Sequence, residues 1–186
     1  MKQLRVLVTA LLVLVFVLLG FVPVVQGVRE ADLDFYGAAY EVNRDISGNL
    51  YVSDPGAQKI WKINPSSGNY VTYSFSQSVR DAQIDNSNRI WWTNNSDTFG
   101  YVNPSNSTVT QWTLTSDAPY TLQALTPDNQ GGVWIGEFGG DRLFHFNPVS
   151  LSLCVYDFGP IGGLYARDLV FQPGFQSGYL WLDQWV

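Results

Sequence analysis

Cysteine and histidine are nearly absent from this 186-residue chain, which contains one of each, Cys154 and His145. A single cysteine cannot form an intrachain disulfide. It also cannot form the paired-cysteine motifs that mark zinc sites and redox centres. The stability of the fold must therefore come from packing.

Positive charge is also scarce. Without the first 27 residues, which contain Lys2 and Arg5, the chain has 8 basic and 16 acidic side chains and a formal charge of −8. A phosphate-binding surface needs the opposite sign, so we expect no nucleic-acid partner.

Long helix-forming tracts are lacking beyond the N-terminus, whereas aromatic residues are abundant. The chain is 46% hydrophobic, 15% aromatic and only 14% charged, which is too apolar for a disordered polymer. The aromatic and β-branched excess, with 17 Gly and 9 Pro, is typical of strands and turns. The composition predicts a mainly β protein.

The N-terminal segment is predicted to be an export signal over residues 1–27, followed by a linker over 28–35. Lys2 and Arg5 precede a 20-residue apolar run, 6–25, interrupted only by Thr9, Gly20 and Pro23. The run suits a cleaved signal peptide, and it is also long enough for an uncleaved membrane anchor. Either alternative places the remainder outside the cytoplasm, secreted or anchored on the outer face of the membrane, with membrane contact only through this segment.

The rest of the chain repeats itself with a period of about 40 residues. Aromatic anchors at Tyr51, Trp91, Trp134 and Trp181 are spaced by 40, 43 and 47 residues. Asn-Pro pairs recur at 64–65, 103–104 and 147–148. Each period reads as four short strands separated by turns, the arrangement of a propeller blade. We predict an all-β fold, an incomplete β-propeller of about three and a half four-stranded blades at 36–77, 78–117, 118–159 and 160–186.

The repeats resemble those of the virginiamycin B (streptogramin B) lyase family and, more broadly, NHL-type repeats. The resemblance lies in Gly-x-aliphatic-aromatic strands followed by a basic-aliphatic strand that ends at Asn-Pro, as in 48–65 and 132–148. It implies a seven-bladed propeller with a metal-assisted lyase site that uses histidine as its base. The chain departs from that pattern because it has no second histidine, so no catalytic residue can be carried over. The alternation of His145 with Phe144 and Phe146 in a strand indicates a packed or edge histidine.

The aromatic strand of each repeat ends at a residue whose side chain contains oxygen, at Asp54, Asn94, Glu137 and Gln184. Such oxygens are the ligands that magnesium and calcium prefer, so Asp54, Asn94 and Glu137 are a candidate metal site. The alternative, which turn propensity favours, is a row of turn residues.

The innermost strand of each repeat begins with a polar residue, namely Glu41, Asp81, Gln123 or Asp168. An arginine, Arg80 or Arg167, precedes two of these residues. Innermost strands line the central channel of a propeller. Glu41, Arg80, Asp81, Arg167 and Asp168 are therefore candidates for a ligand-reading rim, and the favoured alternative is a salt-bridged plug between blades.

Other motifs are weaker. Asn94 and Asn106 each begin a glycosylation sequon. Trp61, Trp91, Trp92 and Trp112 suggest a sugar-stacking platform or, more simply, a packed core.

The function predicted from these observations is that of an exported recognition or scaffold module for an unknown small molecule, glycan or protein. The alternative is a metal-dependent carbon-oxygen lyase whose catalytic blades are missing from this chain. We expect that further blades or a second chain are needed to close the ring, since propellers need about four to eight blades.

Overall fold

The computed structural model describes residues 39–115, 120–159, 164–172 and 178–184. The chain divides into two compact units, 1–32 and 33–186, and every described residue belongs to the second. The predicted export signal and linker therefore lie outside the described residues. Among the described residues we find no helix with the length and apolar character that crossing a bilayer requires.

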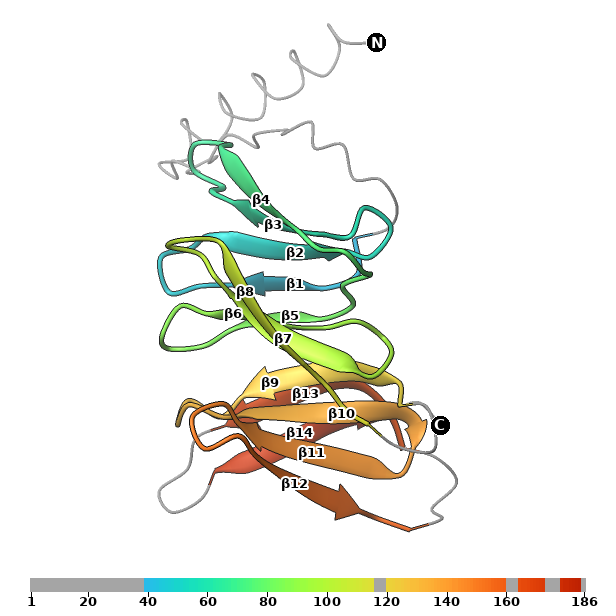
Figure 1. Ribbon diagram of the computed structural model, residues 1–186. Helices are drawn as coiled ribbons and strands as arrows, with labels where there is room; N and C mark the ends of the chain where they lie inside the picture. Colours follow the sequence, from blue (N-terminus) through green and yellow to red (C-terminus); the bar gives the residue numbers. More distant parts are fainter. Residues whose placement is uncertain (1–38, 116–119, 160–163, 173–177, 185–186) are drawn as a thin grey trace, which may run out of the picture. The chain divides into compact units, whose positions relative to one another are not determined.

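Two antiparallel sheets of four strands and one of six strands follow one another along the chain (Figure 1). The six-stranded sheet contains a complete four-stranded blade, one strand of which also pairs with the first strand of the fourth blade. Blade 1 comprises β1 (Val42–Arg44), β2 (Leu50–Asp54), β3 (Lys59–Ile63) and β4 (Tyr70–Ser74). Blade 2 comprises β5 (Ala82–Ile84), β6 (Ile90–Thr93), β7 (Thr98–Asn103) and β8 (Thr108–Thr113). Blade 3 comprises β9 (Leu122–Pro127), β10 (Val133–Gly140), β11 (Arg142–Asn147) and β12 (Ser152–Asp157). Two strands of a fourth blade follow, β13 (Leu164–Gln172) and β14 (Tyr179–Gln184).

An aspartate organises the turn between the two inner strands of each complete blade. The Oδ1 atom of Asp85 accepts hydrogen bonds of 2.9 Å from the backbone N–H groups of Ser87 and Arg89. Asp45 and Asp128 accept equivalent bonds in blades 1 and 3. The fourth residue of the turn has positive φ, +86° at Gly48 and +61° at Asn88, which glycine and asparagine tolerate best. Each inner hairpin is thus fixed by its own local sequence.

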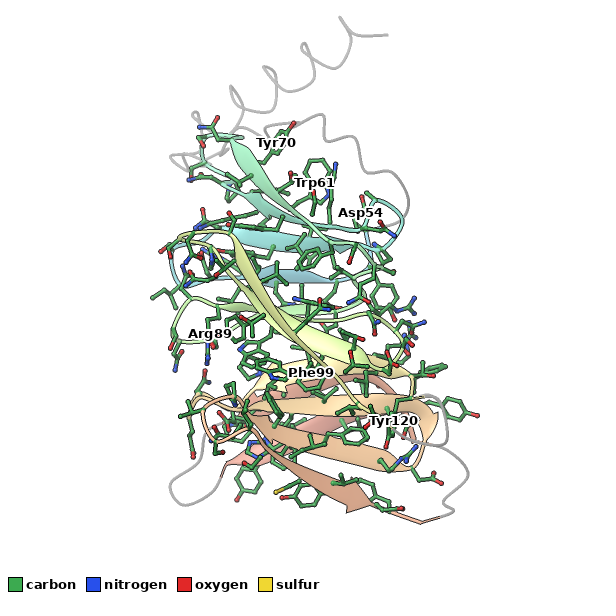
Figure 2. The ribbon with its side chains drawn as sticks, in the orientation of Figure 1. Asp54, Trp61, Tyr70, Arg89, Phe99 and Tyr120 are labelled. Atoms are coloured by element: carbon green, nitrogen blue, oxygen red, sulfur yellow. The ribbon has the colours of Figure 1, made fainter. Side chains whose placement is uncertain are left out.

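The aromatic anchors of the repeat pack each blade against the next. Tyr51 of blade 1 shares a buried cluster with Val79, Ala82 and Trp92 of blade 2. Trp91 and Phe99 of blade 2, the latter labelled in Figure 2, share a cluster with the inner strands of blade 3. Trp134 of blade 3 and Leu180 and Leu182 of β14 pack against one buried cluster, which includes Leu169 of β13. The core therefore lies between the sheets, where large side chains bury the most apolar area.

Hydrogen bonds also join successive blades. The Ser53 hydroxyl donates to the Arg80 carbonyl at 2.7 Å, and the Thr93 hydroxyl donates to the Gln123 carbonyl at 2.9 Å. Gly136 occupies the same strand position in blade 3, where an added Cβ would lie 2.5 Å from the Cβ of Ala166. Blade 3 therefore has no hydroxyl at this position, where Ala166 of β13 leaves no room for a side chain.

Burial falls from the inner to the outer strands. All four residues of β6 are buried, β8 alternates between half-buried and exposed side chains over its second half, and every residue of β12 is exposed. The outer strand β8 therefore has one face that is more exposed than the other.

Candidate ligand site at the start of the inner strands

The backbone register defines two columns of side chains where the inner strands begin. Thr93 N–H donates to the Asp81 carbonyl, Ser53 N–H donates to the Glu41 carbonyl, and Gly136 pairs with Ala124. One column, the acid column, therefore contains Glu41, Asp81, Ala124 and Asp168. The other, the rim column, contains Tyr40, Arg80, Gln123 and Arg167.

This register corrects the place of Gln123, which the sequence pattern groups with the carboxylates. Gln123 lies five residues before the hairpin aspartate Asp128, as Arg80 lies five before Asp85. Residue type was a poorer guide than distance from the turn, because neighbouring strand positions point in opposite directions.

Three members of the rim column contact one another across the blades. The guanidinium carbon of Arg80 lies 3.5 Å from the centre of the Tyr40 ring. The Gln123 carboxamide is best oriented with its oxygen toward Arg80, since the opposite orientation would place its NH2 group against N–H donors. That oxygen then accepts from Arg80 Nε at 2.9 Å, from Arg80 Nη2 at 2.6 Å and from the Tyr40 hydroxyl at 2.8 Å.

A cavity of about 430 Å³ opens beside this cluster. Its lining comes from blades 2 and 3 and from β13, and consists of Arg80, Asn95, Thr121, Gln123, Phe138 and Arg167. We call it the rim cavity. Its volume is in the range of small-molecule sites, and its charged lining groups are both guanidinium groups.

The acid column lies apart from the lining of the rim cavity. Burial raises the pKa of Asp81, with the carboxylates of Glu41 and Asp168 adding to the increase against a hydrogen bond from Leu125 N–H that lowers it. Burial also raises the pKa of Glu41 and of Asp168. Three carboxyl groups on inner strands therefore hold protons more tightly than usual.

The predicted salt-bridged plug is not formed by Arg80 and Asp81. Arg80 stacks on Tyr40, while Asp81 Oδ2 accepts the backbone N–H of Leu125 in the next blade at 2.7 Å. Strand alternation sends the two side chains in opposite directions, so Arg80 keeps the ligand-reading alternative open.

The candidate metal ligands each have local partners. Asp54, labelled in Figure 2 at the end of β2, accepts the Ala57 N–H at 3.0 Å, and Asn94 accepts the N–H groups of Ser96 and Thr98. Glu137 is held in a fork by Arg142, with N–O distances of 2.8 and 2.9 Å. Within the part of the chain that the structure describes, no group of three or more His, Cys, Asp or Glu side chains is arranged to hold a metal ion. A magnesium or calcium site here stays a prediction.

His145 lies at the opposite end of blade 3 from the rim cavity. Its Nε2 atom is 2.8 Å from Asp128 Oδ2, and its ring lies 4.5 Å from that of Trp134. Gln123 and Asp128 are five residues apart on an extended strand, which corresponds to about 16 Å. His145 thus braces the hairpin turn of blade 3, as Trp91 does in blade 2 by donating to Asp85 at 2.9 Å.

The tryptophans and the sequons also have clear positions. Trp91 and Trp92 are fully buried, Trp61 is nearly so, and Trp112 packs against Phe146, so core packing accounts for them. The Nδ2 atom of Asn94 donates to Gln77, whereas Asn106 lies exposed in the turn before β8.

Sequence reasoning missed four residues of this region, Tyr40, Asn95, Thr121 and Phe138. Asn95, Thr121 and Phe138 occur in loops or at strand ends, where no column of the repeat marks them. The sequence could have indicated Tyr40, because it precedes its hairpin aspartate, Asp45, by the same number of residues as Arg80 precedes Asp85.

No family model matches the chain, and no curated protein matches its sequence. Solved structures do match it. Virginiamycin B lyase from Staphylococcus aureus has a TM-score of 0.66 at 17% identity, over 80% of this chain and 50% of that one. The fold is that of a lyase-like β-propeller.

Two other propeller structures also match the chain. YCF48 bound to D1 peptide matches with a TM-score of 0.63 at 16% identity, over 80% of this chain and 49% of that one. The extracellular domain of the B. thetaiotaomicron protein BT4673 matches with a TM-score of 0.56 at 16% identity, over 74% of this chain and 19% of that one. The propeller blades described here span about half the length of the lyase and of YCF48.

Proposed function

We propose that the chain is an exported propeller module that recognises a ligand at the rim cavity. The observation that carries this proposal is the convergence of polar groups from blades 2 and 3 and from β13 on one cavity beside an aromatic ring, Phe138. Ligand sites are concave, combine an apolar surface with a few convergent polar groups, and often lie at the mouth of a barrel or channel.

Two similar structures support recognition outside the cytoplasm. YCF48 is a propeller whose structure is described with a bound peptide, and the BT4673 match is an extracellular domain. The apolar N-terminal run of this chain supports export independently.

The proposal is tested by mapping small-molecule binding onto the ¹⁵N-labelled full chain in a neutral detergent. Fragments should shift the backbone resonances of Asn95, Thr121 and Phe138 together. The hairpin turn at Asp45 lines a separate pocket of about 270 Å³ and provides the internal comparison. Shifts that cluster there, or nowhere, would rule out the rim cavity as the recognition site.

Lyase activity is the second candidate, favoured by the similarity to virginiamycin B lyase. Within the described residues the only histidine is His145, which lies away from the rim cavity and is engaged with Asp128. The test is incubation of a streptogramin B with the chain and magnesium, followed by mass spectrometry for ring opening. Ring opening that a chelator abolishes would establish the lyase in place of the recognition module.

A further inference from the structure

We propose that the rim cavity takes a small organic carboxylate, with its two oxygens on the guanidinium of Arg80 and its apolar part against Phe138. This inference rests on the proposed function, because it names the ligand class of the same cavity. Three observations support the inference: the contacts that hold Arg80, the other residues that line the cavity, and the absence of the nearby carboxyl groups from that lining.

Arg80 is held in place before any ligand arrives. One face of its guanidinium lies 3.5 Å from the centre of the Tyr40 ring, and one edge, Nε with Nη2, is bound by the Gln123 oxygen. A guanidinium has five N–H donors in a planar fork. The edge formed by Nη1 and Nη2 therefore still presents two parallel donors, the arrangement that binds a carboxylate in a bidentate manner. Because stacking already restricts the side chain, a ligand loses less conformational entropy on binding.

No described carboxylate neutralises Arg80. Carboxylates elsewhere in the blades pair with other side chains, Asp85 with Arg89, Glu137 with Arg142, and Asp128 with His145. The comparison with Arg142 is informative, since that side chain also stacks on a tyrosine, Tyr120 at 4.5 Å, labelled in Figure 2. The fork of Arg142 is filled by Glu137, whereas Arg80 has only a neutral amide. An external carboxylate would give Arg80 the partner that Arg142 has within the chain.

The rest of the lining suits a small acid with an apolar end. With the Gln123 oxygen on Arg80, its NH2 group is a donor beside the cavity, and Asn95 and Thr121 add further polar groups. Arg167 contributes a second positive charge to the lining, and Phe138 contributes an apolar surface. The carboxyls of Glu41, Asp81 and Asp168 belong to the other column and do not line the cavity. The charged groups of the lining are thus both guanidinium groups, although the chain as a whole is acidic.

The test compares 3-phenylpropionate with 3-phenylpropionamide, which differ in the charged group and share the aromatic part. Isothermal calorimetry on the full chain should detect the acid and find the amide at least about ten-fold weaker, as expected for a charge-assisted pair. Arg80→Gln should weaken the acid about ten-fold or more and leave the amide unchanged. Arg44→Gln, which alters an exposed arginine at the end of β1 in blade 1 and outside the lining of the rim cavity, should change neither.

The outcomes separate the ligand class from the recognition site. Equal binding of acid and amide at the rim cavity would overturn the carboxylate inference and leave the proposed function intact, whereas binding of neither there would remove both. Inorganic phosphate that binds as tightly as the acid would also overturn it, because the site would then read charge alone. If Arg80→Gln does not fold, Arg80→Lys provides the test, because lysine keeps the positive charge but lacks the planar pair of donors. Unchanged affinity of Arg80→Lys for the acid would refute bidentate recognition.

Discussion

The carboxyl group of Asp81 is 3% exposed, and its Oδ1 atom has no hydrogen-bond partner among the described residues. Because burial raises its pKa, the folded state binds this proton more tightly than the unfolded state does. The stabilising effect of proton binding is fully present below the unfolded pKa and is lost as the pH rises through the folded pKa. Glu41 and Asp168 shift in the same direction and add to this effect.

We therefore expect Asp81→Asn to stabilise the protein at neutral pH. Asparagine keeps an oxygen for the Leu125 N–H and carries no charge, so the gain at pH 8 should be about 1–3 kcal/mol and should shrink toward pH 4. Urea unfolding followed by tryptophan fluorescence across this range measures it. Asp157→Asn, at an exposed position on β12, is the matched control. A stability difference between Asp81→Asn and wild type that does not change with pH would contradict the argument.

The Thr93 hydroxyl forms one of the hydrogen bonds between blades 2 and 3, so its removal measures how much such a bond contributes to stability. Thr93→Val keeps the shape of the side chain but removes the 2.9 Å bond to the Gln123 carbonyl. A buried carbonyl left without its donor costs about 1–3 kcal/mol, and thermal unfolding should report that loss. Thr110→Val on the outer strand β8 is the control, since the Thr110 hydroxyl bonds to no described residue and its replacement should change stability little.

The equivalent position in blade 3 gives the opposite experiment. Gly136→Ala places a methyl group against the Cβ of Ala166, so overpacking should destabilise the chain by about 1–3 kcal/mol. The double variant Gly136→Ala with Ala166→Gly removes the opposing methyl and should recover part of the loss. Denaturant unfolding of the three proteins measures both effects. No recovery in the double variant would mean that Leu169, 3.3 Å from the added atom, sets the limit instead.

The strands were predictable from the sequence because their signal is local. Tyr51, Trp91 and Trp134 repeat at the blade spacing, and each turn that begins with an aspartate and has Gly or Asn at its fourth position determines its own hairpin. The site was predictable only in part. Arg80 was a candidate, but its contact with Tyr40 joins residues 40 apart and depends on how two blades pack. The grouping of Gln123 with Asp81 failed because a shift of one residue reverses the direction of a strand side chain.

On the scale of the whole chain, β13 and β14 present an apolar face. Val170 pairs with Trp181 on it, and both are more than half exposed, at 53% and 60%. The corresponding anchors of the complete blades, Tyr51 and Trp91, are fully buried by the next blade. A face of this kind favours association.

We expect the 28–186 segment to self-associate through this face. Trp181→Glu should increase the monomer fraction in sedimentation velocity runs, because burying a carboxylate in an apolar contact is costly. Tyr70→Glu, at an exposed tyrosine on β4 labelled in Figure 2, is the control and should leave the distribution unchanged. A wild-type segment that sediments as a monomer and binds no hydrophobic dye would refute the expectation.

Side-chain donors near the inner strands reach carbonyls of the next blade along the chain. Asn43 and Ser53 of blade 1 donate to carbonyls of blade 2, and Thr93 of blade 2 donates to blade 3. Blade 2 thus accepts such bonds from blade 1, at the Arg80 and Ala82 carbonyls, and donates one to blade 3. A tandem copy of residues 78–117, inserted after the original, would carry the Arg80 carbonyl that the original Thr93 hydroxyl needs, and its own Thr93 hydroxyl would face the Gln123 carbonyl. Duplication of a single repeat can therefore lengthen such a gene while keeping these bonds, and unequal recombination between repeats can shorten it just as simply.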